Sequence, residues 1–213
     1  MHLFGKRIPL SVSLLFWFVV WEVVGWVGIS SIFPPLSKIV AAGATILPTE
    51  KFVKAMEISL RSFVVGMALA LVIGISLGVL MARVRSMADI LGTWVNIFVS
   101  APISALVPIL MAVLGIGETT VVATVFLFAV FVIILDTQVG IRKADQSLIE
   151  MARSFRARGY QIYTKVLVLS ALPEILAGIR LGAIRGVKGV VIGQLLVSIM
   201  GVWELFEMYS KHF

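Results

Sequence analysis

Few residues of this sequence have the chemistry for making or breaking bonds, and they do not gather into a site. The chain has no cysteine, and its two histidines, His2 and His212, stand near opposite ends of the sequence. Catalysis needs a convergent set of nucleophile, base or metal ligands, and a disulfide framework needs cysteines. We therefore expect neither an enzyme nor a metal or redox centre, and no cofactor held by this chain.

Basic side chains inside an apolar stretch indicate another kind of chemistry, the attraction of an anion. Arg180, Arg185 and Lys188 lie in the apolar stretch at residues 175–200, and Lys188 lies the furthest from its start. Lys188 could attract an anionic substrate. Arg180 and Arg185 can snorkel towards the headgroups, whereas Lys188 lies too far in. Alternatively, the span starts later, or these side chains face an aqueous vestibule between subunits. The sequence leaves these interpretations open.

The apolar segments that must position these residues are typical of an integral membrane protein. Hydrophobic residues make up 60% of the 213 and charged residues only 14%, against about 25% charged in soluble domains. The first apolar run contains Glu22, to which we assign a structural role, and lacks the cleavage site of a signal peptide. We predict an all-α fold with about five transmembrane helices, at residues 10–29, 60–82, 88–114, 119–136 and 175–200.

The third apolar run is interrupted by two prolines, Pro102 and Pro108. Proline has no N–H to donate, so it leaves a backbone carbonyl of the preceding turn without a hydrogen bond. Within a membrane such a carbonyl is tolerated only where neighbouring protein or a water-filled cavity supplies another donor. The pattern indicates either the wall of a transport pathway or a packing kink. The candidate pathway residues are the polar, basic or kink-forming ones of the third and fifth runs, namely Asn96, Ser100, Pro102, Lys188 and Gln194.

A basic, amphipathic segment at residues 140–173 separates the last two runs. The spacing of Ser147 and Glu150 predicts a capping box, so a helix should begin near Leu148. Gly159 should end it, because glycine readily takes the left-handed conformation found at helix ends. At 100° per residue one face of this helix is apolar, and it consists of Leu148, Ile149, Met151, Ala152 and Phe155.

The distribution of basic residues predicts the orientation of the chain. The net charge is +7, and most Lys and Arg residues outside the spans lie on the side of the N-terminus and of residues 140–173. The positive-inside rule places that side in the cytoplasm. Because the charge follows the loops in this way, we expect membrane lipid rather than nucleic acid as the partner of this surface.

Three short motifs resemble a known family. Glu150-Met151-Ala152, with Gly159 and Leu172-Pro173 further on, is similar to the cytoplasmic loop of the membrane-spanning subunits of bacterial ATP-binding-cassette importers of the binding-protein-dependent type. Residues 114–118 (LGIGE) and 136–140 (DTQVG) resemble segments of the nitrate, sulfonate, taurine and bicarbonate branch. The likeness covers residues 60–198, most of the chain.

The resemblance implies a permease that works with other proteins. In the family the amphipathic helix is a coupling helix, which seats in a groove of a separate ATPase subunit. The chain lacks a G-x-x-x-x-G-K-[ST] phosphate loop, so ATP would be bound by that partner. The other implied partners are a periplasmic or lipoprotein solute-binding protein and a second copy of this chain. The implied ATPase-coupling residues are Leu148, Glu150, Met151, Ala152, Arg153, Phe155, Arg156, Arg158 and Gly159.

The chain departs from the family pattern at a few positions. Arg156 stands where relatives usually have Gly, Leu169 where they often have Pro, and Gln194 where they often have Glu. The family usually has six spans, and we expect the last one to be missing here. We therefore divide the chain into an N-terminal helix with a surface segment, a permease core containing the coupling loop at 140–173, and a short outer tail, at residues 1–59, 60–200 and 201–213.

We predict the permease subunit of an inner-membrane importer with its N-terminus in the cytoplasm. It would form the path for a small, anionic solute similar to nitrate, a sulfonate or taurine. One alternative is a secondary transporter or channel, for which paired intramembrane carboxylates are expected; the spans offer only Glu22 and Asp136, far apart in the sequence. Another is a truncated permease without transport activity.

Overall fold

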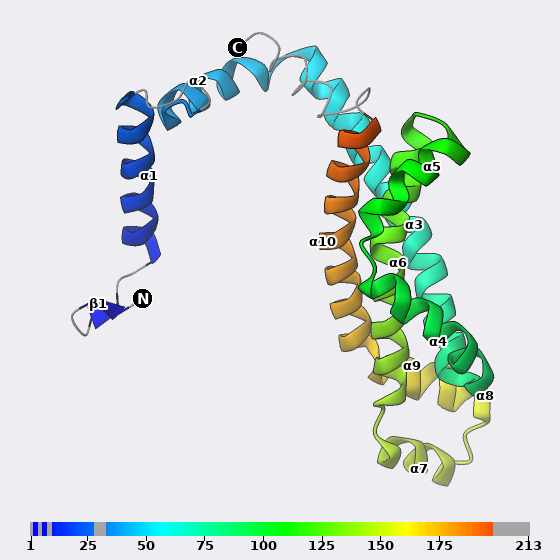
Figure 1. Ribbon diagram of the computed structural model, residues 1–213. Helices are drawn as coiled ribbons and strands as arrows, with labels where there is room; N and C mark the ends of the chain where they lie inside the picture. The colour runs from blue at the N-terminus through cyan, green and yellow to red at the C-terminus, as the bar shows by residue number, and fades with distance from the viewer. Residues whose placement is uncertain (1, 4–5, 8–9, 28–32, 198–213) are drawn as a thin grey trace. The chain divides into compact units, whose positions relative to one another are not determined.

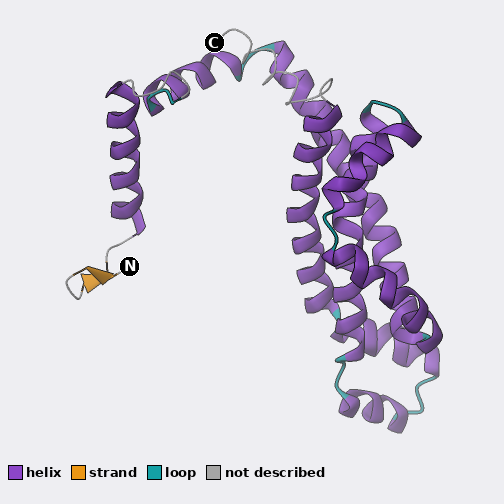
Figure 2. Cartoon of the chain, in the orientation of Figure 1, coloured by secondary structure: helices purple, strands orange, loops and turns teal. Residues whose placement is uncertain are grey.

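The computed structural model describes residues 2–3, 6–7, 10–27 and 33–197, and these are almost entirely helical (Figure 2). The chain divides into two compact units, Met1–Val53 and Lys54–Phe213. The first unit begins with a strand pair that the sequence did not predict, β1 (His2–Leu3) and β2 (Lys6–Arg7). The predicted tail at 201–213 and the end of the fifth run lie outside the described residues.

Two helices make up the rest of the first unit, α1 (Leu10–Val27) and α2 (Leu36–Ile46). The carboxylate of Glu22 accepts hydrogen bonds from the Trp26 indole at 2.7 Å and from the Ser37 hydroxyl at 2.6 Å and amide at 3.0 Å. Glu22 therefore ties the middle of α1 to the start of α2. This agrees with a structural role for that carboxylate.

The described residues contain three unbroken helices that are long and apolar enough to span a membrane: α1, α3 (Glu50–Arg83) and α6 (Glu118–Arg142). Two bent helix pairs raise the number to five if each is one span, which agrees with the predicted number. Residues 50–59, which belong to the predicted surface segment, form one unbroken helix with the apolar residues that follow them in α3.

The first bent pair contains the two prolines. It consists of α4 (Arg85–Ser100), a 3-10 turn η1 (Ile103–Leu106) and α5 (Val107–Leu114), with an angle of 97° at the break. Ala101 and Pro102 are extended or irregular there, because proline cannot donate to the preceding turn. Pro108 lies in the first turn of α5, where a missing amide costs nothing.

Contacts at both ends of α3 show that this bent pair crosses the bundle. Near one end of the bundle Arg61 of α3 forms an ion pair with Glu118, the first residue of α6. Near the other end Arg142, the last residue of α6, donates a hydrogen bond to the carbonyl of Met81 in α3 at 3.2 Å. The helices α3 and α6 therefore run parallel. Residues 84–117 must return from one end to the other, so α4–α5 is a broken span rather than a re-entrant loop.

Helix α6 is the centre of the second unit, with α3 and α10 (Leu172–Val197) on its sides (Figure 1). Both neighbours approach it through glycine. A Cβ added at Gly78 of α3 would lie 2.6 Å from the Thr137 Cβ, and one added at Gly178 of α10 would lie 2.6 Å from the Asp136 Cβ. These distances are shorter than any real Cβ contact, so only glycine permits such close packing. The glycines of α3 and α10 therefore serve the packing of these helices against α6.

The segment between α6 and α10 contains α7 (Gln146–Ser154), α8 (Gly159–Ile162), a π turn η2 (Tyr163–Leu167) and α9 (Val168–Ser170). The predicted capping box is wrong: the N-cap is Asp145, whose carboxylate accepts from the Ser147 amide at 2.9 Å. Asp is at least as good a cap as Ser, and its use leaves Ser147 inside the helix.

The predicted end of this helix is also wrong. The helix stops at Ser154, and Arg156 takes the left-handed conformation with φ of 55°. Gly159 instead opens α8. The left-handed position explains why glycine is usual in the family where this chain has Arg156, since glycine has no Cβ to strain the backbone there.

Candidate coupling helix and translocation cavities

Helix α7 lies beyond the ends of α6 and of the α8–α9 segment (Figure 1). Its N-terminus is fixed by Asp145, whose pKa is held below its ordinary value by hydrogen bonds, first from the backbone amide and then from the side chain of Ser147. A carboxylate at this position also complements the positive end of the helix dipole. The start of α7 is therefore well defined in position.

The apolar face predicted for this helix is divided by the structure. Ala152 is 8% exposed and packs inward, and Leu148 and Ile149 are half-buried. Met151 and Phe155 are 52% and 81% exposed. Two large apolar side chains therefore project at the end of the bundle, Met151 from α7 itself and Phe155 from the C-cap position that follows it. The polar residues of the predicted coupling set are all exposed, namely Glu150, Arg153, Arg156 and Arg158, as is Gly159.

The segment that follows α7 is attached to α3. The Tyr163 hydroxyl donates to the carbonyl of Val79 at 3.0 Å. The Arg83 guanidinium lies 5.6 Å from the centre of the Tyr163 ring, within the range of a cation–π interaction. Together with the bond from Arg142 to Met81, these contacts connect both ends of the α7 segment to the last turns of α3.

A cavity lies beside the break in α4–α5, and we call it the central cavity. It has a volume of about 360 Å³. Two of the predicted pathway residues line it, Pro102 from the break and Lys188 from α10. Arg185, one turn before Lys188, lines it as well, so two cations face one space. The remaining lining residues are Val99, Ala101, Ile103, Ser104, Phe128 and Ile192.

A second cavity, which we call the polar cavity, lies nearer the α7 end and has a volume of about 430 Å³. A third predicted pathway residue, Asn96, lines it. Arg142 and Asp89 bring charges of both signs, and the other lining residues are Ala88, Gly92, Thr93, Leu135 and Gln138. Asp89, Thr93, Gln138 and Arg142 were not among the predicted pathway residues, although the spacing of Asp89, Thr93 and Asn96 on one helix face is visible in the sequence.

The remaining two pathway candidates lie elsewhere. Ser100 is exposed at the end of α4 and lines neither of these cavities. Gln194 is 3% exposed and donates a hydrogen bond of 2.8 Å to the hydroxyl of Ser59, which is also buried. This contact joins α3 to α10. In this conformation Gln194 acts as a packing contact between two helices.

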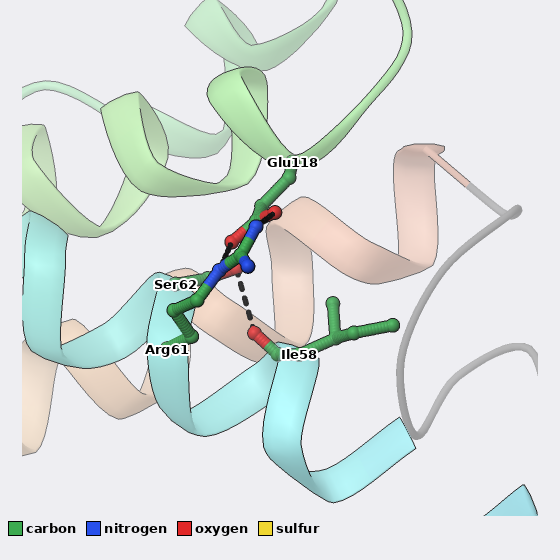
Figure 3. Close-up of polar contacts among 4 residues, drawn as sticks. All are labelled: Ile58, Arg61, Ser62 and Glu118. Atoms are coloured by element: carbon green, nitrogen blue, oxygen red, sulfur yellow. Dashed lines mark hydrogen bonds and ion pairs between the residues drawn. The ribbon is translucent and has the colours of Figure 1, made fainter. Parts of the chain in front are cut away.

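The end of the bundle opposite α7 is marked by the ion pair between Arg61 and Glu118 (Figure 3). The Arg61 Nε donates to a Glu118 carboxylate oxygen at 2.7 Å. Next to it the Ser62 hydroxyl donates to the Ile58 carbonyl at 2.9 Å, within the same helix. Since Arg61 is 66% exposed, the pair contributes little to stability. Its value here is that it fixes which ends of α3 and α6 lie together.

A helical bundle with a broken span beside a charged cavity is typical of membrane transport proteins. The chain belongs to the family described as binding-protein-dependent transport system inner membrane component, whose sequence profile matches residues 70–209. This is a transport family rather than a family of enzymes. The resemblance deduced from the sequence motifs is therefore confirmed.

Relatives within this family have several named substrates. A putative ABC transporter permease of Methanocaldococcus jannaschii is 33% identical over 138 residues, which are 65% of this chain and 52% of the relative. A putative aliphatic sulfonates transport permease, SsuC of Bacillus subtilis, is 29% identical over 186 residues, 86% of this chain and 67% of the relative. The carnitine transport permease OpuCD of Listeria monocytogenes is 34% identical over 115 residues, 54% of this chain and 52% of the relative. The chain thus spans about half the length of the first and third of these relatives.

Proposed function

We propose that this chain is the permease subunit of an importer driven by a separate ATPase subunit. The observation that carries the proposal is α7, which presents exposed Met151 and Phe155 from the connection between two spans. An apolar pair on a short helix fits a groove in a partner. The coupling set then comprises these two residues, Ala152 and Leu148 behind them, and the surrounding polar residues Glu150, Arg153, Arg156, Arg158 and Gly159.

The proposed complex has two copies of this chain in the inner membrane, two ATPase subunits that bind ATP, and an external solute-binding protein. Arg142, Lys143 and Arg153 flank or belong to the α7 segment, and such basic loops favour the cytoplasmic side. The N-terminus would lie on the same side. Family membership supports the ATPase and the binding protein as partners, and both are proposed here for this chain.

The contacts of the α7 segment support a route for the coupling. Closure of the ATPase would pull α7, and the attachments of Tyr163 to Val79 and of Arg142 to Met81 would carry the movement to α3. The glycine contacts of α3 and α10 with α6 favour movement of these three helices together. ATP binding would then bias the equilibrium between outward and inward openings, because the ATPase has different affinities for the two states.

The solute that we propose is small and carries an anionic group. Arg185 and Lys188 face the central cavity, where their two positive charges together attract a negative charge. Carnitine and aliphatic sulfonates, named for two relatives, each contain an acidic group of the charge that these two cations attract. Asn96, Ser100 and Pro102 would line the remainder of the path, and Gln194, which is buried and bonded to Ser59, would support the helices around it.

The test is uptake by the reconstituted complex. The chain is purified with the ATPase subunit encoded nearest to it, combined with the solute-binding protein in liposomes, and assayed with a radiolabelled alkanesulfonate and with carnitine. We expect uptake that requires ATP, falls strongly in Lys188→Gln and Arg185→Gln, and persists in Arg180→Gln, which lies on the same helix outside the central cavity. Uptake that follows an ion gradient without ATP would support a secondary transporter and refute the proposal.

A further inference from the structure

Helix α4 has three distinct faces. Val95 is buried against the bundle, and Ile90, Trp94 and Ile97 are 61%, 60% and 50% exposed on a second face. The third face is polar, with residues at positions i, i+4, i+7 and i+11 that fall within about 60° of one another at 100° per residue. This polar face consists of Asp89, Thr93, Asn96 and Ser100, all exposed.

A polar face on a membrane span needs a wet or polar neighbour. Hydrocarbon cannot hydrogen-bond to hydroxyl, amide and carboxylate groups, so such side chains in spans face a bundle interior or a water-filled cavity. The exposed apolar residues of α4 are suited to lipid. The polar face, which includes the carboxylate of Asp89, is not. The two exposed faces of α4 therefore require different surroundings.

The polar cavity covers most of this polar face, and the central cavity begins beside its last residue, Ser100, which itself lines neither cavity. Asp89, Thr93 and Asn96 line the polar cavity, and Val99 and Ala101, on either side of Ser100, line the central cavity. From Asp89 to Ser100 the helix rises about 16 Å. Along α6, the residues Phe128 of the central cavity and Gln138 of the polar cavity are separated by about 15 Å. The polar face is thus as long as the distance between the cavities.

We propose that the polar face of α4 and the two cavities form one water-filled conduit, in which Arg142 is a second binding position for the anionic group of the solute. This inference deepens the proposed function and rests on it. An anion leaving Arg185 and Lys188 meets hydrogen-bonding groups of Ser100, Asn96 and Thr93 before it reaches Arg142.

The position of Arg142 suits this role. Its Nη2 donates to the Met81 carbonyl at 3.2 Å, which anchors the guanidinium at the wall of the polar cavity. A guanidinium has five N–H donors in total, so others remain to bind a carboxylate or sulfonate. Asp89 lines the same cavity, and its negative charge weakens the binding of an anion there, so that the anion is not held too tightly to leave.

The conduit is tested by thiol accessibility, since the chain has no cysteine of its own. Single variants Asn96→Cys and Ser100→Cys are compared with Ile97→Cys, a matched control on the exposed apolar face of the same helix. The complex with its ATPase is placed in liposomes and treated with an anionic sulfonatoethyl or a cationic trimethylammonioethyl methanethiosulfonate. We expect both polar-face thiols to react and the Ile97→Cys thiol to stay unmodified. Equal reaction at all three positions, or none at Asn96→Cys and Ser100→Cys, would overturn the proposal.

The charges are tested by the ratio of anionic to cationic reagent rates, each normalised to a free thiol in solution. Removing a unit charge about 8 Å away in a wet site changes the two rates in opposite directions, and so changes their ratio by about sixfold at low ionic strength. We expect Arg142→Gln to lower the ratio measured at the Asn96→Cys thiol and to leave it unchanged at the Ser100→Cys thiol. Lys188→Gln should lower the ratio at the Ser100→Cys thiol and leave it unchanged at the Asn96→Cys thiol. Arg142→Lys, which keeps the charge, should preserve the ratio; a fall equal to that of Arg142→Gln would contradict an electrostatic role.

The outcomes for this inference and for the proposed function are separable. If the wild-type chain does not bind the ATPase subunit, the proposed importer function is refuted, whatever the reactivity of the introduced thiols. If uptake depends on ATP but the thiols of Asn96→Cys and Ser100→Cys do not react, the conduit is refuted and the importer function stands.

Discussion

Truncating Phe155 to alanine should weaken binding of the ATPase subunit more than any other single change on α7. The Phe155 side chain is 81% exposed, and a phenylalanine offers about 200 Å², so about 160 Å² is available to a partner. At about 25 cal/mol per Å², full burial contributes about 4 kcal/mol. An alanine keeps about a third of that area, so the loss is about 2.5 kcal/mol, or roughly 70-fold in Kd.

The assay is titration of the detergent-purified chain with labelled ATPase subunit. Met151→Ala should have a smaller effect, since Met151 is only 52% exposed. Val113→Ala is the control, because Val113 is 77% exposed on α5, at the opposite end of the bundle from α7. A Kd for Phe155→Ala within twofold of wild type, or an equal loss with Val113→Ala, would refute the docking role of α7.

Three further predictions concern stability. Gly78→Ala should destabilise the bundle by about 1–3 kcal/mol, because its Cβ would lie 2.6 Å from that of Thr137. Gly43→Ala, with nothing within 4 Å, should be neutral or stabilising by up to about 1 kcal/mol, and thermal unfolding in detergent compares the two. Asp145→Ala should speed amide exchange in the first turn of α7. The hydrogen bonds of Asp145 lower its pKa, so in the wild type these amides should be fully protected from exchange at pH values above 3.8, the ordinary pKa of an aspartate. The protection should disappear as the pH falls below that value. Protection that increases on acidification would contradict this. Gln194→Leu should lower the free energy of unfolding by about 1 kcal/mol through loss of its interhelical hydrogen bond, and the affinity for the ATPase should be unchanged. If stability is normal and uptake is altered, Gln194 instead contributes to the solute pathway.

The spans were predictable because hydropathy depends on local sequence alone. The break at Pro102 was predictable for the same reason, since proline blocks its own hydrogen bond wherever it lies. The cap of α7 was not, because Asp145 and Ser147 are both good caps and only the path of the chain decides between them. The division of the α7 face also escaped prediction. A helical wheel gives one apolar face, and contacts with distant segments determine that Ala152 turns inward and Phe155 outward.

The cavities show the same limit. Lys188 and Pro102 were predicted because each is unusual in its own segment, and the structure places both at the central cavity. Arg142 escaped notice because basic residues at the ends of spans commonly serve as orientation signals. Gln194 looked equally unusual in its span, yet it meets Ser59, 135 residues earlier in the sequence. Sequence patterns identify polar residues in spans, and only tertiary contacts distinguish a cavity wall from a buried hydrogen bond.

The break in α4–α5 also has a consequence for how the chain is made. Residues 85–114 enter the membrane during synthesis before α10 has been translated, so Arg185 and Lys188 are not yet beside the interrupted backbone at Pro102. Until then the free backbone groups at the break must be satisfied by water or by the insertion machinery. The helix that lies beside the break leaves the ribosome about 70 residues later, and we expect nascent chains that stop before residue 172 to integrate residues 85–114 less stably than the full chain.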